Sequence, residues 1–324
     1  MAQEETKPTA SSDGLSALAA KVLDQLSLTS WLPAALLTAG IAVLFQFRTL
    51  NSIDLPLAVS ELAEDPFQFL VLVFPLLVIA TVITQAFSFS AIRMLEGYWR
   101  RGWLANLFVV LMTKCQERKK KSSETTILKY KRRAFKTARE RMLSAGISVA
   151  IVCSIEELFR DQKLSLHLTD RQTADMDKIM WKDYCNPWQV SKLDHLEGDL
   201  PYYPRPSRLL PTTLGNKLRA TEDNLLNTNG DLEGFILGRW SLMPQHLRIQ
   251  HDEFRDRLEM YCTLVFVAII LSGATILVFL GSNIQIWQTI LLALSFLALA
   301  AVSYSAAITS AAGYCTVLKQ VDDL

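Results

Sequence analysis

The sequence predicts a mainly α-helical polytopic membrane protein, with four transmembrane helices in a 2+2 arrangement around a cytoplasmic, mostly helical insert. The first observation behind this prediction is a set of four apolar stretches, at residues 31–50, 67–92, 260–280 and 284–318. Each is close to or longer than the ~20 residues that cross a bilayer as a helix. Their interiors carry no Asp, Glu, Lys, Arg or His except Arg48, which lies near the end of the first stretch.

The second observation is the distribution of charge. Residues 93–257 hold 29 of the 33 Lys and Arg residues, against 21 acids, and residues 114–141 alone hold twelve bases and three acids. Positive residues close to span ends stay on the cytoplasmic side. We therefore expect a multi-pass protein of a bacterial inner membrane, with the insert, the N-terminus and the C-terminus all cytoplasmic.

These two patterns divide the chain into five parts. Residues 1–30 form an N-terminal tail with a short amphipathic helix over 15–28, which either lies on the membrane or packs on the insert. Residues 31–92 and 258–318 are the two transmembrane pairs, residues 93–257 are the cytoplasmic domain and residues 319–324 are the C-terminal tail.

Within the insert, several segments have a readable pattern. Residues 124–160 are expected to be mainly helical, with an apolar face of Ile127, Ala134, Ala138 and Met142. Gly146 interrupts this pattern, and the β-branched residues of 147–155 favour a strand. The apolar run 104–112 is too short to cross a membrane, so it either lies at the interface or packs into the soluble core. Five prolines in 186–211 predict an extended connector.

The spans themselves suggest packing or pore residues. Hydroxyl and small side chains recur at helical spacing in the fourth span, where they allow close helix approach. They serve either packing within one subunit or a pore lining or oligomer contact. The candidates are Ser295, Ser303, Ala307, Thr309 and Ser310.

A motif near the end of the insert resembles a known group of proteins. The run Leu210-Pro-Thr-Thr-Leu-Gly-Asn-Lys-Leu-Arg-Ala-Thr-Glu-Asp223 is similar to the L-P-T-x-L-G-N-x-L-R-A-x-E-D box of uncharacterised bacterial multi-pass membrane proteins. The resemblance extends from Tyr202 to the third span and, more loosely, to the four-span layout. It implies a bacterial membrane protein and no particular activity.

The residues of the box predict a loop followed by the start of a helix. It acts either as a structural clamp or as a ligand or coupling contact near the membrane. The candidates for that second role are Asn216, Arg219, Glu222 and Asp223, with Glu222 and Asp223 expected to pair with Arg219.

The preferred functional hypothesis is a homo-oligomeric channel or membrane effector regulated by its cytoplasmic domain. The alternative is a non-conducting scaffold or receptor that recruits a cytosolic protein. An enzyme is not expected, because the chain has no phosphate-binding glycine loop, H-E-x-x-H motif or nucleophile elbow. We likewise expect no cofactor, no metal site and no nucleic-acid partner. The expected partners are the lipid bilayer and further copies of the chain.

Overall fold

The computed structural model describes residues 28–64, 66–99, 102–160, 180–198, 200–225 and 232–323. Helices make up most of these residues, and none of them lies in a strand. The chain divides into two compact units. We call Met1–Arg100 together with Leu225–Leu324 the span unit, and Arg101–Asn224 the insert unit. The amphipathic helix predicted over 15–28 falls almost entirely outside the described residues.

The four predicted apolar stretches are helices, which confirms the mainly helical class with four candidate membrane spans. They are α2 (Leu28–Leu50), α4 (Pro66–Glu96), α11 (Gln245–Phe279) and α12 (Ile286–Asp322). Each contains a segment long and apolar enough to cross a membrane. A short helix, α3 (Leu55–Glu64), lies between α2 and α4.

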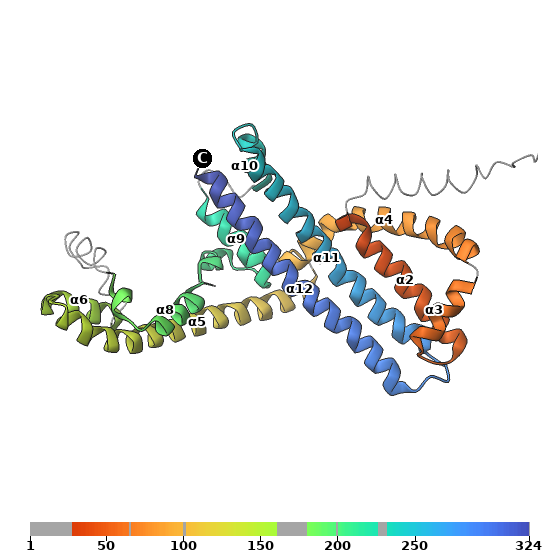
Figure 1. Ribbon diagram of the computed structural model, residues 1–324, viewed down its shortest axis with the longest axis horizontal. Helices are drawn as coiled ribbons and strands as arrows, with labels where there is room; N and C mark the ends of the chain where they lie inside the picture. The colour runs from red at the N-terminus through yellow and green to blue at the C-terminus, as the bar shows by residue number, and fades with distance from the viewer. Residues whose placement is uncertain are drawn as a thin grey trace, which may run out of the picture. The chain divides into compact units, whose positions relative to one another are not determined.

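Helices α11 and α12 form a long antiparallel hairpin (Figure 1). They contain 35 and 37 residues, which at ~1.5 Å per residue is more than 50 Å each. Gly281 closes the turn at φ +77°, a conformation that residues with a side chain rarely adopt. Because a hydrocarbon layer is only ~30 Å thick, the end of the hairpin away from this turn extends beyond any bilayer it crosses.

The first two spans, α2 and α4, pack against α11 of this hairpin, and their ends lie at defined levels along it. Near the turn, Leu44 and Phe47 of α2 share an apolar cluster with Phe279. At the other end, Pro33 of α2 and Ser88 of α4 line the same small cavity as Glu259 of α11. The start of α2 and the end of α4 therefore lie at the same level of α11, away from the turn.

A helical cap covers the end of the hairpin that lies away from the turn. Helix α10 (Leu232–Arg239) packs Phe235 and Ile236 against Leu318 and Val321 of α12. Arg239 donates to the Val321 carbonyl at 3.1 Å and to the Asp322 carboxylate at 2.8 Å. A cation near a helix C-terminus is favourable, because the last carbonyls have no partner within the helix.

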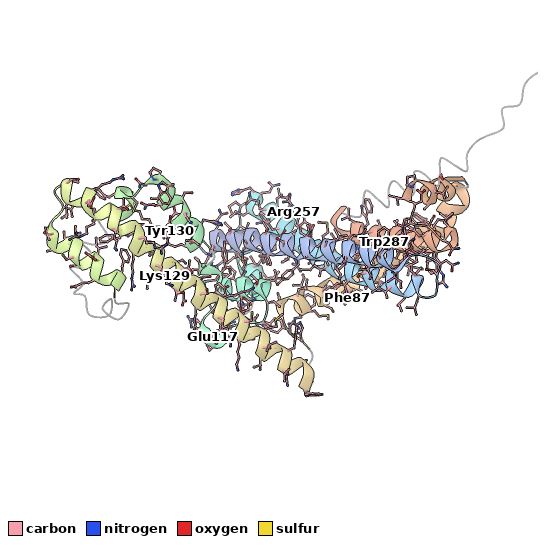
Figure 2. All side chains as sticks on the ribbon, turned by 90° about the horizontal axis from the view of Figure 1, so that it is seen from below. Phe87, Glu117, Lys129, Tyr130, Arg257 and Trp287 are labelled. Carbon is pink, nitrogen blue, oxygen red and sulfur yellow. The ribbon has the colours of Figure 1, made fainter. Side chains whose placement is uncertain are left out.

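The insert unit is built on α5 (Trp103–Ser144), a single helix of 42 residues. Helix α6 (Val149–Arg160) turns back against it after Gly146, whose φ of +84° breaks the helix where the sequence predicted an interruption. The predicted apolar face is confirmed, because Ile127, Ala134, Ala138 and Met142 are all buried. Figure 2 marks Glu117, Lys129 and Tyr130 along α5.

Two predictions for this unit are wrong. Residues 147–155 form no strand: α6 begins at Val149, and Val152 and Ile155 lie three residues apart and pack one helical face into the core. The connector predicted over 186–211 contains a full helix, α8 (Pro187–Glu197), and two short 3-10 turns, η3 (Leu200–Tyr202) and η4 (Pro206–Arg208). Pro187 starts a helix here because the first helical position needs no N–H partner.

An aromatic group fills the core of the insert unit. Phe135, Phe159 and Trp181 meet edge to face, with ring centroids 5.1 to 5.9 Å apart. These rings join α5 and α6 to η2 (Trp181–Tyr184). An ion-pair network lies nearby: Glu197 of α8 accepts from Lys131 and, at 2.8 Å, from Lys182, which also reaches Asp194 at 2.9 Å.

Candidate functional site

The box that resembles other membrane proteins opens helix α9 (Thr213–Asn224), as predicted. Asn216 is 1 % exposed, and its side chain faces back toward the preceding segment. Its Oδ1 accepts from the Leu210 N–H at 2.7 Å, and its Nδ2 donates to the Leu210 carbonyl at 3.0 Å. One amide thus satisfies both backbone hydrogen-bonding groups of the half-buried Leu210, which serves to hold the chain in place.

The acidic residues of the box pair chiefly with an arginine that the sequence did not single out. Arg208 donates to Glu222 at 2.6 Å and to Asp223, whereas Arg219 lies 3.8 Å from Glu222. Asp223 also accepts from the Arg205 backbone N–H at 3.0 Å. Burial raises the pKa of the Glu222 carboxyl above its ordinary value, although Arg219 and Arg208 act in the opposite direction. The signal that could have found Arg208 is its position in the turn just before the box.

The box also holds the connector onto α5. Gln116 is 7 % exposed, and its amide donates to Thr213 at 3.4 Å. Lys120 donates to the Pro204 carbonyl at 3.4 Å, with its ammonium 6.0 Å from the Tyr203 ring centroid. The four candidate residues therefore lie together, and the side chains of Asn216, Glu222 and Asp223 join residues 205–210 to α9 within the insert unit.

The five candidates on α12 fall on two different faces. Ser303, Ala307 and Ser310 are buried, with Ala307 at 0 % exposed. They belong to two interleaved buried series with seven-residue spacing, one with Ala293, Ala300 and Ala307 and the other with Ser303, Ser310 and Val317. A seven-residue period is the signature of two helices that keep one seam in contact along their length. These three residues therefore pack against α11 in the same chain.

The other two candidates lie on an exposed face. Ser295 and Thr309 stand in a line with the exposed Ala298, Val302 and Ser305. Their hydroxyls bond within the helix, Ser295 to the Leu292 carbonyl at 2.7 Å and Thr309 to the Ser305 carbonyl at 3.1 Å. Large apolar side chains are also exposed on α12, namely Leu291, Leu294 and Leu297, and on α11, namely Ile269, Ile270, Ile276 and Leu277.

A recess at the capped end of the hairpin was not predicted. It encloses about 290 Å³ and is lined by Ile236, Leu237, Trp240, His251, Asp252, Arg255 and Tyr314. The His251 ring is 3 % exposed, lies edge-on to Trp240 with centroids 5.8 Å apart, and lies 5.2 Å from the centroid of Tyr314. Its Nδ1 is 3.0 Å from an oxygen of Asp252. Aromatic walls with one acid and one base suit a small ligand that has an apolar body and a polar end.

The antiparallel register of the hairpin brings the walls of this recess together. His251 and Tyr314 are 63 positions apart in the sequence but face each other across α11 and α12. Near this level, Gly313 faces the ring of Phe254, where even a single added carbon would lie 2.7 Å from Cδ1. The seven-residue period of apolar and small residues in both helices was the signal that could have predicted this contact. Counting equal distances back from the turn that contains Gly281 along each helix brings His251 opposite Tyr314.

A smaller cavity lies where α2, α4 and α11 meet. It encloses about 40 Å³, and its lining includes Thr84, Gln85 and Ser88 of α4 with Asp256 and Glu259 of α11. That is more than the ~10–15 Å³ that one water requires, and polar walls favour water over an empty void. Within the described ranges, no group of three or more His, Cys, Asp or Glu side chains has a metal-binding arrangement.

Comparison of the chain with protein family models, curated proteins and solved structures found no match.

Proposed function

We propose that this protein is an oligomeric integral membrane protein of a bacterial inner membrane, a channel or membrane effector regulated by its cytoplasmic part. The observation that carries this proposal is the exposed face of α12. Small and hydroxyl side chains leave shallow grooves that lipid tails fill less well than another helix does. The exposed line of Ser295, Ser305 and Thr309, which also contains Val302, suits contact with a second copy, or a water-filled path between copies.

A single copy offers little room for such a path. Helix α12 packs one small-residue face on α11, and α11 in turn packs on α2 and α4. A symmetric ring of copies is the usual way for so few spans to enclose a pore. In such a ring, the second face of α12 would be the surface that the copies share.

Regulation is supported by the length of the hairpin. Both α11 and α12 continue without interruption from their apolar segments to the cap made by α10. A shift at the capped end, where the His251 recess lies, would reach the membrane segment through two rigid helices. Sliding or rotation of packed helices is an established way to transmit such a shift.

The test is to reconstitute the full chain in liposomes and nanodiscs and to measure ion flux and particle mass. We expect a closed oligomer that conducts ions. The double variant Ser305→Leu with Thr309→Leu fills the exposed face of α12, so it should reduce both the particle mass and the flux. The matched control is Ile276→Leu on the exposed face of α11, which should change neither quantity.

The second candidate function is a scaffold or receptor that recruits a cytosolic protein and conducts nothing. It is favoured by the bonds of Ser295 and Thr309 to their own helix, because hydroxyls satisfied in this way can face lipid without water. An oligomer that carries no flux would favour this function. A monomer without flux would contradict the pore and the oligomer together.

A further inference from the structure

The first turns of α5 expose apolar side chains. Trp103 is 76 % exposed, and Leu107 and Leu111 are each 62 % exposed. Among the described side chains of α5, the first buried one is Gln116, where contact with the rest of the insert unit begins. Scattered apolar residues are normal on a surface, but a contiguous run marks a surface that binds something.

The charge on this helix changes just after the apolar run. At 100° per residue, Lys114, Arg118 and Lys121 fall on the same face as Trp103 and Leu107, and all five are exposed. Residues 114–121 contain five bases and one acid, Glu117, which pairs with Lys121 at 2.7 Å. The outward face of α5 is therefore apolar over its first turns and basic over the next ones.

The opposite side of the helix is already occupied. Gln116 and Lys120 point toward the connector of their own unit, where they contact Thr213 and the Pro204 carbonyl. The outward face therefore remains available to a partner. That partner must accept indole and leucine side chains at one end of the face and cations at the other.

The chain connection indicates which partner is within reach. Helix α4 ends at Glu96, and α5 begins seven residues later at Trp103. Because an extended chain covers at most ~3.6 Å per residue, the two ends are within ~25 Å of each other in any arrangement of the units. Where α4 ends, the Trp99 indole N–H donates to the Met94 carbonyl at 2.8 Å. The apolar start of α5 is thus tethered to the end of a span.

We propose that the outward face of α5, from Trp103 to Lys121, binds the lipid surface at which α4 ends, and that it prefers anionic lipid. Trp103, Leu107 and Leu111 enter the boundary between headgroups and acyl chains, and the bases that follow contact the phosphates. This is the arrangement expected of an interfacial helix near a charged leaflet. Since α5 continues into the core at Phe135, headgroup charge acts directly on the position of the insert unit. The contact does not depend on whether the protein conducts.

The test measures the depth of single sites in the full chain. Cys115 and Cys153, which are exposed, are first replaced by Ser. Spin labels are then placed by Leu107→Cys, Leu111→Cys and Lys136→Cys in separate proteins reconstituted in nanodiscs with or without anionic lipid. Lys136 is the matched control, because it lies on the same face of the same helix and is also exposed. Accessibility to oxygen, which concentrates in lipid, is compared with accessibility to a water-soluble nickel chelate.

We expect the labels at 107 and 111 to favour oxygen and the label at 136 to favour the nickel chelate. Labels at 107 and 111 that are as accessible to nickel as the control would overturn the proposal. Labels shielded from both reagents would overturn it as well, because they would show that protein covers this face.

A second arm tests the role of charge. The triple variant Lys114→Gln, Arg118→Gln and Lys121→Gln removes three bases from the outward face. Each base near an anionic surface changes the binding constant about fivefold. The oxygen preference at 107 should therefore fall in anionic nanodiscs and change little in neutral ones. A preference that is the same in both lipids, with and without the bases, would contradict the anionic part of the proposal.

Discussion

Gly313 shows how closely the hairpin is packed at the level of one residue. An added carbon at this position would meet three atoms of the Phe254 ring, two of them at 2.7 and 2.8 Å, and a packed ring cannot move aside easily. We predict that Gly313→Ala lowers the free energy of unfolding by about 1–3 kcal/mol, the usual cost of overpacking. Thermal unfolding of the full chain in detergent would measure this loss.

Gly273 provides the control in the same hairpin. Nothing lies within 4 Å of an added carbon there, and the residue is inside α11. Gly273→Ala should therefore be neutral or stabilise by up to ~1 kcal/mol, because alanine loses less backbone entropy in a helix. Equal effects of the two substitutions would contradict the packing described at Gly313.

The box shows what residue spacing can and cannot predict. Its helix was predictable, because Pro211 and the spacing of Leu214 and Leu218 are local signals, and both leucines are buried. The pairing with Arg208 was not predictable from the helix alone. That arginine is 14 residues before Glu222, and only the folded turn brings the two charges to 2.6 Å.

At the scale of elements, the ion-pair network around α8 should make the insert unit sensitive to acid. Burial opposes the ionisation of Glu197, but hydrogen bonds from Lys131 and Lys182 outweigh it and lower the pKa of this carboxyl. A lowered carboxyl pKa adds stability above the ordinary value of 4.5, and that stability is lost as the pH falls through the folded-state pKa. Burial also opposes the charge of Lys182, yet its bonds to Glu197 and Asp194 raise its pKa, which keeps it charged throughout this range.

We therefore predict that Glu197→Gln destabilises the insert unit near neutral pH and has a progressively smaller effect in acid. The loss should be about 1 kcal/mol or less, because the network is partly exposed. Urea-unfolding midpoints at a series of pH values would measure it. The exposed Glu140 of α5 is the control, and Glu140→Gln should have little effect at any pH. A loss for Glu197→Gln that does not depend on pH would rule out the ion pairs as its cause.

The small residues of α12 show what the sequence could and could not predict about an element. The sequence predicted that the small residues of the fourth span are packing or pore residues, but it did not predict which of them lie on the buried face of the helix. Ser303 and Ser310 are seven residues apart and both buried, whereas Thr309, adjacent to Ser310, is exposed. One helix thus has small and hydroxyl residues on its buried face and others on its exposed surface, and only the position of the partner helix separates them.

At the scale of the whole molecule, the arrangement of the spans supports the proposed topology. Pro33, Ser88 and Glu259 lie around one cavity, so the start of α2, the end of α4 and the charged part of α11 are at one level. The turn that contains Ser282 lies at the other end of the hairpin, and Trp287 follows it closely (Figure 2). If the basic insert is cytoplasmic, this turn is exposed outside the membrane.

We predict that Ser282→Cys reacts with a membrane-impermeant maleimide in intact cells that express the chain. In contrast, Glu124→Cys should react only after the cells are permeabilised. Both substitutions are made with Cys115 and Cys153 replaced by Ser, because these thiols are exposed. Labelling of position 124 in intact cells would place the basic helix outside and contradict the topology, together with the regulation proposed from it.

The sequence by itself determined the mainly helical class, the four apolar helices long enough to span a membrane, the buried face of α5 and the helix of the box. These properties follow from composition and local periodicity, which act over a few turns of chain. The tertiary structure decided the face of α12 that is buried, the arginine that pairs with the box, and the recess around His251. Each of these depends on segments that lie far apart in the sequence, such as His251 and Tyr314, and the distance between such segments is set by packing rather than by local propensity.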